Sequence, residues 1–313
     1  MEQRNVGRSG LRVSALGLGC NAFGMRCDAA QSQAIVSAAL DAGVTLFDTA
    51  DTYAQGRSEE FLGKALGARR VDAVVATKFG FSMGPGREGG SRRYIYRAVE
   101  DSLRRLGTDW IDLYQLHFPD PLTPIGETIS TLEDLKRQGK IRYYGCSNLS
   151  ATQLTEAALV ADRIGADGFV STQAEYSLLA RRVEQEELPV LRKYGLSLLP
   201  YWPLGNGVLT GKYSKGERPA GSRLTDPNTA WLSRQSERLL AQDTLARVAA
   251  FEAFAAARGH SLLELALGWL AGDGAVASVI AGASSPQQVA ANAAAFNWRL
   301  TADEMQSVAA LLE

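Results

Sequence analysis

Short apolar runs alternate with longer amphipathic segments along most of the chain. The runs have the length and the apolar character of buried strands. They cover 15–19, 44–47, 73–78, 111–117, 141–146, 168–173, 196–201 and 275–281. The segments between them repeat apolar residues every three or four positions, as in Val99, Leu103 and Leu106, which is typical of helices with one buried face. Pro189 interrupts the segment after Arg182, so a helix there has the weakest support.

Alternating strands and helices predict a parallel sheet that helices cover. Eight such units without a break in composition favour a closed (β/α)8 TIM barrel over an open sheet, and we expect residues 1–313 to form a single domain. The stretch RNVGRSGLRV, residues 4–13, predicts an N-terminal β-hairpin that caps the bottom of the barrel. A polar segment rich in Pro and Gly follows the seventh strand at 205–228, and the chain from Thr301 onward predicts an extra C-terminal helix.

The bulk composition excludes several classes of protein. The chain has 313 residues, 46% hydrophobic and 21% charged, with a net charge of −1. A charge near zero disfavours nucleic acid and anionic membranes as main partners, because both attract basic surfaces. The N-terminal stretch MEQRNVGRSG has no apolar signal region, and Cys20, Cys27 and Cys146 have no paired spacing. We therefore expect a cytoplasmic protein without disulfide bonds or a membrane span.

Polar side chains stand at the predicted carboxyl ends of three consecutive strands, where a barrel carries its chemistry. Asp48 ends the second strand, with Tyr53 five positions further on, Lys78 ends the third strand, and His117 ends the fourth. Taken singly, each has a structural reading, such as an Asp48–Lys78 ion pair or a satisfied core histidine. Their occurrence together favours a catalytic site, because unpaired charge is costly in an apolar wall.

Six stretches, in this order along the chain, resemble the signatures of the aldo-keto reductase superfamily. They read FDTADTYAQGRSEEFLGKAL, VVATKFG, DLYQLHFPD, GKIRYYGCSNLS, TQAEYSLL and YWPLGNGVLTGKY, and the resemblance extends over about residues 11–295. It implies a (β/α)8 barrel that reduces carbonyl compounds with a nicotinamide cofactor, usually NADPH, and without a metal. The family's catalytic tetrad falls on Asp48, Tyr53, Lys78 and His117.

The expected reaction explains why these four residue types are needed. Hydride transfer to a carbonyl carbon builds negative charge on the carbonyl oxygen, and Tyr53 would protonate that oxygen as a general acid. A phenol has a pKa of about 10, so a cation beside it helps the transfer. Lys78 would supply that cation, Asp48 would hold Lys78, and His117 would hydrogen-bond the carbonyl oxygen.

The resemblance also implies a set of cofactor contacts. They fall on Gly19, Cys20, Asn21, Asp48, Ser147, Asn148, Gln173, Tyr201, Trp202, Pro203, Leu204, Gly207, Gly211, Lys212, Gly282, Ser284, Gln288 and Asn292. Within this set, Ser147, Asn148 and Gln173 would hold the nicotinamide carboxamide, and Tyr201 would stack on the ring. The backbone from Pro203 to Gly211 would surround the pyrophosphate.

Two features qualify the choice of cofactor. The stretch GLGCNA, residues 17–22, is similar to a dinucleotide fingerprint, but no helix opens directly after it, so we do not interpret it as one. No Arg or Lys lies between Gly282 and Asn292 to grip a 2′-phosphate, although the hydroxyls of Ser284 and Ser285 offer donors. We expect NADPH, with NADH as the open alternative.

Four aromatic residues are candidates for the mouth of a substrate pocket. They are Phe23, Phe118, Trp202 and Trp231, each of which also fits core or loop packing. Such a pocket suits aldehydes and ketones of some apolar character. The sequence leaves the physiological substrate and the oligomeric state open.

Two other functions remain as alternatives to an NADP-dependent aldehyde or ketone reductase. One is a nicotinamide-binding regulatory subunit with little turnover, as in the channel-associated branch of the same superfamily. The other is a glycosidase with paired carboxylates such as Asp48 and Glu175, but their predicted strands lie far apart, and that reaction needs neither Lys78 nor Tyr53.

Overall fold

The central feature of the fold is a closed parallel barrel. The computed structural model describes residues 1–213, 224 and 233–311. Among these residues, an eight-stranded parallel sheet has the order β10-β3-β4-β5-β6-β7-β8-β9. The strands are β3 (Leu16–Gly19), β4 (Leu46–Asp48), β5 (Val74–Phe79), β6 (Ile111–Leu116), β7 (Ile141–Ser147), β8 (Ser171–Glu175), β9 (Ser197–Tyr201) and β10 (Val279–Gly282). Leu198 closes the ring, because its N–H donates to Ala275 and its carbonyl accepts from Ala277. The predicted (β/α)8 barrel is therefore confirmed.

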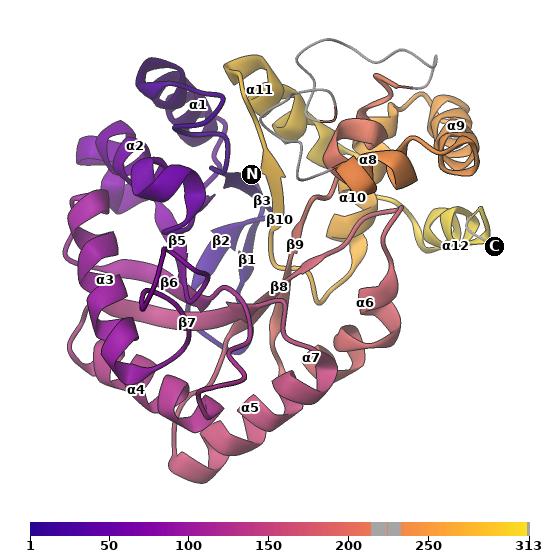
Figure 1. The fold of residues 1–313 in the computed structure, drawn as a ribbon. Coiled ribbons are helices and arrows are strands. Elements are labelled where there is room, and N and C mark those ends of the chain that lie inside the picture. Colours follow the sequence, from indigo (N-terminus) through magenta and orange to yellow (C-terminus); the bar gives the residue numbers. More distant parts are fainter. Residues whose placement is uncertain (214–223, 225–232, 312–313) are drawn as a thin grey trace.

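Helices surround the barrel (Figure 1). The main ones are α1 (Ala29–Asp41), α2 (Arg57–Leu66), α3 (Arg92–Leu106), α4 (Ile125–Arg137), α5 (Ala151–Ile164), α7 (Glu187–Tyr194), α9 (Gln242–Ala256), α10 (Leu262–Gly272) and α11 (Pro286–Ala294). Shorter helical segments are η1 (Tyr53–Gly56), η2 (Gly67–Asp72), α6 (Arg182–Gln185), η3 (Gly205–Thr210), α8 (Ser233–Leu239) and η5 (Ala295–Asn297). Several helices begin at capping boxes in which side chain and backbone bond reciprocally, with Asp28 and Gln31 at α1 and Ser150 and Gln153 at α5.

The segment with the weakest sequence signal forms two short helices. The chain leaves α6 at Glu186 and re-enters a helix at once, so that Pro189 is the third residue of α7. Backbone N–H groups in the first turn of a helix have no intrahelical acceptor, and proline is tolerated there for that reason. The proline thus restricts where the helix begins rather than excluding it.

The N-terminal hairpin closes the bottom of the barrel, as predicted. β1 (Gln3–Asn5) pairs antiparallel with β2 (Arg12–Ser14), and the N–H of Gly7 donates to the hydroxyl of Ser197 at the start of β9, at 2.8 Å. Apolar hairpin residues join barrel-interior residues in one cluster of Val6, Leu11, Val13, Leu46, Ala76, Leu113, Leu199, Ala277 and Ile280. This packing leaves the opposite, carboxyl-terminal rim of the strands for the polar residues.

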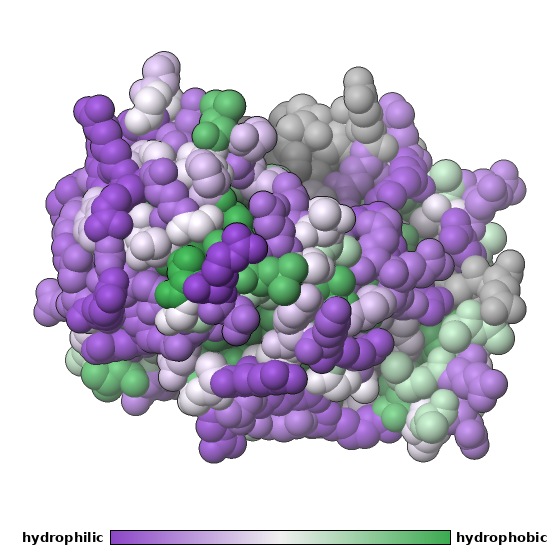
Figure 2. Space-filling view, turned by 90° about the horizontal axis from the view of Figure 1, so that it is seen from below, coloured by the Kyte–Doolittle hydropathy of each residue, from purple (hydrophilic) through white to green (hydrophobic). Residues whose placement is uncertain are grey.

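The extra C-terminal helix is also present, as α12 (Ala302–Ala310), and it lies at the periphery of the molecule (Figure 1). The face seen in Figure 2 is mostly hydrophilic, with its apolar side chains in small separate groups. None of the described helices combines the length and the apolar character needed to span a membrane.

Candidate active site

Lys78 lies at the centre of the polar residues on the carboxyl-terminal rim. Ala76, two positions earlier in β5, points into the barrel interior, and strand alternation directs Lys78 to the same side. The side chain of Lys78 is only 1% exposed. Its Nζ donates to Asp48 Oδ2 at 2.7 Å, to the carbonyl of Thr49 at 2.8 Å and to the hydroxyl of Tyr53 at 3.4 Å.

The charge state of Lys78 follows from these partners. Burial by itself lowers the pKa of a lysine, but the carboxylate of Asp48 and the hydroxyl of Tyr53 outweigh this effect and raise the pKa of Lys78 above its ordinary value. The ammonium group is therefore charged at neutral pH, and it sits beside the phenol.

His117 completes the group of four. Its backbone N–H donates to the carbonyl of Phe79 at 2.8 Å, which fixes it just beyond the end of β6. Its ring lies edge-on to that of Tyr53, with 6.0 Å between the ring centroids. Burial, and to a lesser degree the charge of Lys78, lower the pKa of His117 well below its ordinary value, so the imidazole is neutral. The structure thus brings all four expected residues together.

A chain of hydrogen bonds connects this group to the ends of β7, β8 and β9. Gln173 Nε2 donates to Asp48 Oδ1 at 2.5 Å, and Ser147 Oγ donates to the carbonyl of Gln173 at 3.2 Å. Asn148 has a positive φ of 63° and donates from Nδ2 to the carbonyl of His117, while its Oδ1 accepts from the hydroxyl of Tyr201 at 2.8 Å. These polar residues are among the cofactor contacts that the family resemblance implies. Hydrogen bonds therefore connect them to the four central residues.

The end of β3 lies on the other side of Asp48. Gly19 pairs in register with Asp48 on one neighbouring strand and with Gly282 on the other. The N–H of Cys20 donates to the carbonyl of Asp48 at 2.8 Å. Burial raises the pKa of the Cys20 thiol, which makes it unreactive, and Asn21 follows it at the rim.

Beyond β9 the chain turns sharply through residues of unusual backbone geometry. Trp202 has a φ of 53°, and its ring stands perpendicular to that of Tyr201. Pro203 and Leu204 lead into η3, where Gly207 has a φ of 98°. The remaining two expected contacts of this segment, Gly211 and Lys212, follow directly after η3.

The remaining expected cofactor contacts lie at and near the start of α11, after β10 and Gly282. Ser285 caps this helix, and Ser284 donates from its N–H and its hydroxyl to Gln288 Oε1, at 2.8 and 3.1 Å. Asn292, two turns further along α11, is buried. Helix N-termini favour anions through their free N–H groups and the helix dipole.

The expected aromatic wall is only partly assembled. Phe118 stacks on His117 and is 38% exposed, whereas Phe23 is completely buried in the core. Trp231 lies outside the described residues. Phe81, which we did not single out in the sequence, packs against both His117 and Phe118 and is 49% exposed. Its place in a loop gave no periodic signal.

Gln115 is a second residue that the sequence left unassigned. It is buried in β6 directly opposite Lys78 in the strand register, and its Nε2 lies 3.5 Å from Asp48 Oδ1. Period-two alternation from Leu113, which points into the barrel, would have placed it beside the expected site.

The paired-carboxylate alternative does not fit the barrel. Asp48 is at the end of β4 and Glu175 at the end of β8, and the sheet order places three strands between them on either side of the ring. Glu175 instead accepts a hydrogen bond from Gln235 and faces Arg238. In the described part of the chain, no group of three or more His, Cys, Asp or Glu side chains could hold a metal ion.

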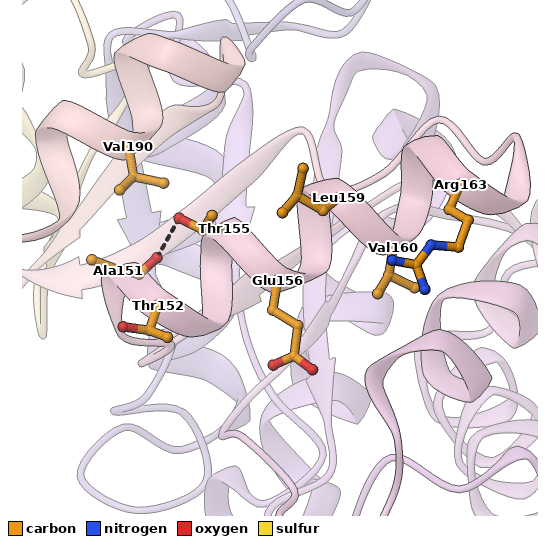
Figure 3. A pocket seen from close by; sticks show the side chains of 8 residues that line it. All are labelled: Ala151, Thr152, Thr155, Glu156, Leu159, Val160, Arg163 and Val190. Atoms are coloured by element: carbon orange, nitrogen blue, oxygen red, sulfur yellow. Dashed lines mark hydrogen bonds between the residues drawn. The ribbon is translucent and has the colours of Figure 1, made fainter.

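An open groove of about 580 Å³ lies on the outer surface, away from these residues (Figure 3). Side chains of α5, among them Leu159 and Arg163, line it together with Val190 of α7. Within it, the hydroxyl of Thr155 donates to the carbonyl of Ala151 inside the helix. None of the expected catalytic residues lines this groove.

Comparison with known proteins agrees with the fold. The model of the aldo/keto reductase family matches residues 15–313. A protein of Oryza sativa subsp. japonica named "Probable voltage-gated potassium channel subunit beta" is 43% identical over 298 residues, which cover 93% of this chain and 90% of the relative. The "Uncharacterized oxidoreductase YqkF" of Bacillus subtilis is 38% identical over 314 residues, which cover 98% of this chain and 95% of the relative.

The match of the family model to nearly the whole chain and the extent of these identities lead to one conclusion. The chain belongs to the aldo/keto reductase family.

Proposed function

We propose that this protein is a nicotinamide-dependent reductase of aldehydes or ketones, with Tyr53 as the proton donor. One observation carries the proposal: the buried ammonium group of Lys78 contacts both the Asp48 carboxylate and the Tyr53 hydroxyl. A purely structural ion pair has no need of a phenol beside the cation. An acid catalyst does, because the cation stabilises the phenolate that forms when the proton leaves.

The residues around this group suit a nicotinamide cofactor. Gln173 is buried at this rim with its Nε2 bonded to Asp48 Oδ1, and its side-chain oxygen is the type of acceptor that a carboxamide N–H needs. The hydroxyl of Ser147 and the rings of Tyr201 and Trp202 are at the same rim. Gly207 supplies room for a cation, because a Cβ at this position would lie 2.7 Å from Lys212 Nζ. An amide acceptor suits the carboxamide, aromatic faces suit the nicotinamide ring, and a lysine suits the phosphates of a dinucleotide.

When bound, the reduced nicotinamide supplies the hydride for the carbonyl carbon. His117, neutral because of its burial, donates a hydrogen bond to the carbonyl oxygen and orients it. Tyr53 then delivers its proton to that oxygen, and Lys78 stabilises the phenolate left behind. Asp48 holds Lys78 in place and, through Gln173, connects it to the residues proposed to hold the carboxamide. Phe81 and Phe118 offer apolar contact to the rest of the substrate.

We propose NADPH as the cofactor, with contacts at Ser284, Gln288 and Asn292 on the adenosine side. The hydroxyl and N–H of Ser284 donate to Gln288 Oε1 in this structure, and a phosphate would take the place of that acceptor, since a helix N-terminus favours anions. NADH is the alternative, because no arginine or lysine lies between Gly282 and Asn292.

A regulatory subunit is the second candidate function. It has support in the printed names of two plant relatives, each called "Probable voltage-gated potassium channel subunit beta", at 43% and 40% identity. In that case the protein would retain its cofactor and associate with a membrane channel, with few turnovers. The same tetrad is compatible with either role.

The first experiment follows NADPH oxidation with 4-nitrobenzaldehyde in the wild type, Lys78→Met and Lys64→Met. We expect many turnovers per protein in the wild type and a loss of at least about 100-fold in Lys78→Met, because general acid catalysis contributes this much. Lys64 is an exposed residue of α2 and serves as the matched control. A wild type that completes one turnover and retains the cofactor contradicts the reductase and favours the regulatory subunit.

A further inference from the structure

A second group of polar residues lies behind Lys78, between the barrel and helices α2 and α3. Asp51 is its central member: it follows β4 in the loop that leads to Tyr53, and it is 2% exposed. Its N–H donates to the carbonyl of Lys78 at 3.3 Å, which places the loop directly beside the lysine. The mechanism described above gives Asp51 no role.

The carboxyl group of Asp51 has few hydrogen-bond donors. The hydroxyl of Tyr94, on α3, is 3.5 Å from Oδ2, and Oδ1 has no partner among the described residues. Burial raises the pKa of Tyr94 overall, although the charge of Arg87, from the loop after β5, acts to lower it. An ionised carboxylate in such a place loses hydration that the protein does not replace, so the neutral form is favoured there.

The charged neighbours of Asp51 come from each element packed against it. Glu59 of α2 is fully buried and accepts from the hydroxyl of Thr77 and from Nε of Arg105, both at 2.6 Å. Arg105, from α3, therefore has a carboxylate partner already. Tyr114 of β6 faces the same space with a buried hydroxyl that has no partner among the described residues.

Glu59 thus holds the nearby arginine, Asp51 has no ion pair with it in the described part of the chain, and Lys78 lies on the barrel side. Burial, followed by the charge of Glu59, raises the pKa of Asp51 to about 7, while Arg105, the backbone N–H of Thr52 and, least of the three, Lys78 act in the opposite direction. The N–H of Asp51 donates to the carbonyl of Lys78 and both side chains are buried, so the charge of one residue acts on the other. A carboxyl group that ionises near neutral pH would change the electrostatic field at Lys78 and, through it, at Tyr53.

We propose that Asp51 is a positioning residue that adjusts the acidity of Tyr53 through Lys78, so that Tyr53 is the stronger proton donor while Asp51 is neutral. The inference rests on the proposed role of Tyr53 as the donor. Once Asp51 is ionised, its negative charge offsets part of the positive charge of Lys78. Less of that charge then stabilises the phenolate, and reduction slows as the pH rises through the ionisation of Asp51.

The kinetic test compares the wild type with Asp51→Asn, which is isosteric and always neutral. With saturating NADPH and 4-nitrobenzaldehyde, we expect the wild-type kcat to fall about threefold through pH 7, and we expect Asp51→Asn to lack this fall. Asp72→Asn removes the same charge at an exposed position and should keep the wild-type profile. A fall near pH 7 that persists in Asp51→Asn overturns the proposal, as does an equal loss of kcat at every pH.

A second variant covers the case in which Asp51→Asn does not fold, as judged by circular dichroism. Tyr94→Phe removes the hydroxyl that donates to Asp51, which disfavours the ionised carboxylate. The fall in kcat should then move to higher pH with kcat at low pH unchanged. A profile that does not move contradicts the proposal.

A spectroscopic measurement separates this inference from the proposed function, since it needs no turnover. Tyrosine labelled with 13C at the ζ carbon reports the ionisation of each phenol, and the resonance missing in Tyr53→Phe identifies Tyr53. We expect Tyr53 to ionise at lower pH in Asp51→Asn than in the wild type. If the protein reduces no carbonyl compound but this shift occurs, the reductase proposal fails and the role of Asp51 stands. If the two titrations coincide, the role of Asp51 fails even in an active reductase.

Discussion

The ammonium group of Lys78 lies among three oxygen atoms, from Asp48, Thr49 and Tyr53, and water has almost no access to it. Burying a lysine and an aspartate together is not an efficient way to stabilise a barrel, since the desolvation cost is comparable with the Coulombic gain. The geometry is better explained by the charge that it provides beside a phenol. At the scale of residues, the proposed function therefore depends on the contact between the Lys78 ammonium group and the Tyr53 hydroxyl.

The hydroxyl of Tyr53 is the atom whose removal tests that explanation most directly. Tyr53→Phe should lower kcat for aldehyde reduction by at least about 100-fold, because the only proposed proton donor is lost. Binding of NADPH, followed by fluorescence titration, should stay within about twofold of the wild type, since the proposed role of the hydroxyl is toward the substrate and not toward the dinucleotide. Tyr96→Phe removes a half-exposed hydroxyl elsewhere on α3 and should leave both quantities unchanged. Wild-type turnover in Tyr53→Phe would exclude Tyr53 as the donor.

At the scale of elements, the two rims of the barrel differ in character: one packs apolar side chains, and the other carries the proposed catalytic residues. The hairpin β1–β2 packs Val6, Leu11 and Val13 at the bottom against apolar residues of the strand interiors. The carboxyl ends of β4 and β5 and the segments that follow β4 and β6 carry the polar residues at the opposite rim. Substitutions in the hairpin should therefore affect folding without affecting the reaction.

Val13 provides the test of this division. Val13→Ala should lower the free energy of unfolding by about 2 kcal/mol, because it removes two buried methyl groups and leaves a cavity. Urea unfolding measures this difference, and kcat should not change. Arg12→Ala, at the adjacent exposed position, is the control and should be neutral. A large loss of activity in a folded Val13→Ala protein would show that the floor of the barrel is coupled to the site.

At the scale of the whole molecule, ring closure joins residues from distant parts of the chain. Gln173 hydrogen-bonds to Asp48, which is 125 residues earlier, and Gly282 of β10 lies next to Gly19 of β3. The proposed dinucleotide site runs along this rim from β7 to the start of α11. We therefore expect the preference between NADPH and NADH to depend on the assembled barrel, and in particular on the residues at the start of α11.

The preference between NADPH and NADH can be measured by quenching of tryptophan fluorescence. We expect NADPH to bind at least about tenfold more tightly, because a phosphate gains charge-assisted hydrogen bonds at the start of α11. Ser284→Ala should weaken NADPH binding and leave NADH binding unchanged, whereas Ser307→Ala on α12 should affect neither. Tighter binding of NADH would show that the absence of an arginine between Gly282 and Asn292 determines the cofactor.

Much of the architecture was predictable because strands and helices leave different periodic patterns. The eight apolar runs, the hairpin at 4–13 and the helix from Thr301 all correspond to observed elements. Boundaries were less accurate: the last run, predicted at 275–281, is the strand Val279–Gly282 preceded by residues that pair with β9 and close the barrel. Where a strand begins depends on which neighbouring strand each residue pairs with, and the periodicity of apolar residues carries no information about pairing.

The residues of the proposed site show the same limit. Asp48, Lys78 and His117 were identifiable because charged or polar groups ended apolar strands, where a barrel places its functional loops. Phe81 and Asp51 were not, because a loop aromatic and a loop carboxylate are ordinary in sequence, and their roles come from neighbours on other strands and helices. Phe23 had the right type for a pocket but is completely buried.

The sequence by itself determined the order of strands and helices and the polar residues at three strand ends, since these depend on periodicity and local chemistry. Only the tertiary structure decided which side chains meet: that Lys78 contacts a phenol, that Gln115 and Gln173 face Asp48, and that Asp51 lies buried behind the lysine. The reason is physical. Burial and the distance between charges set the acidity of each group, and both arise when the barrel closes and brings distant strands together.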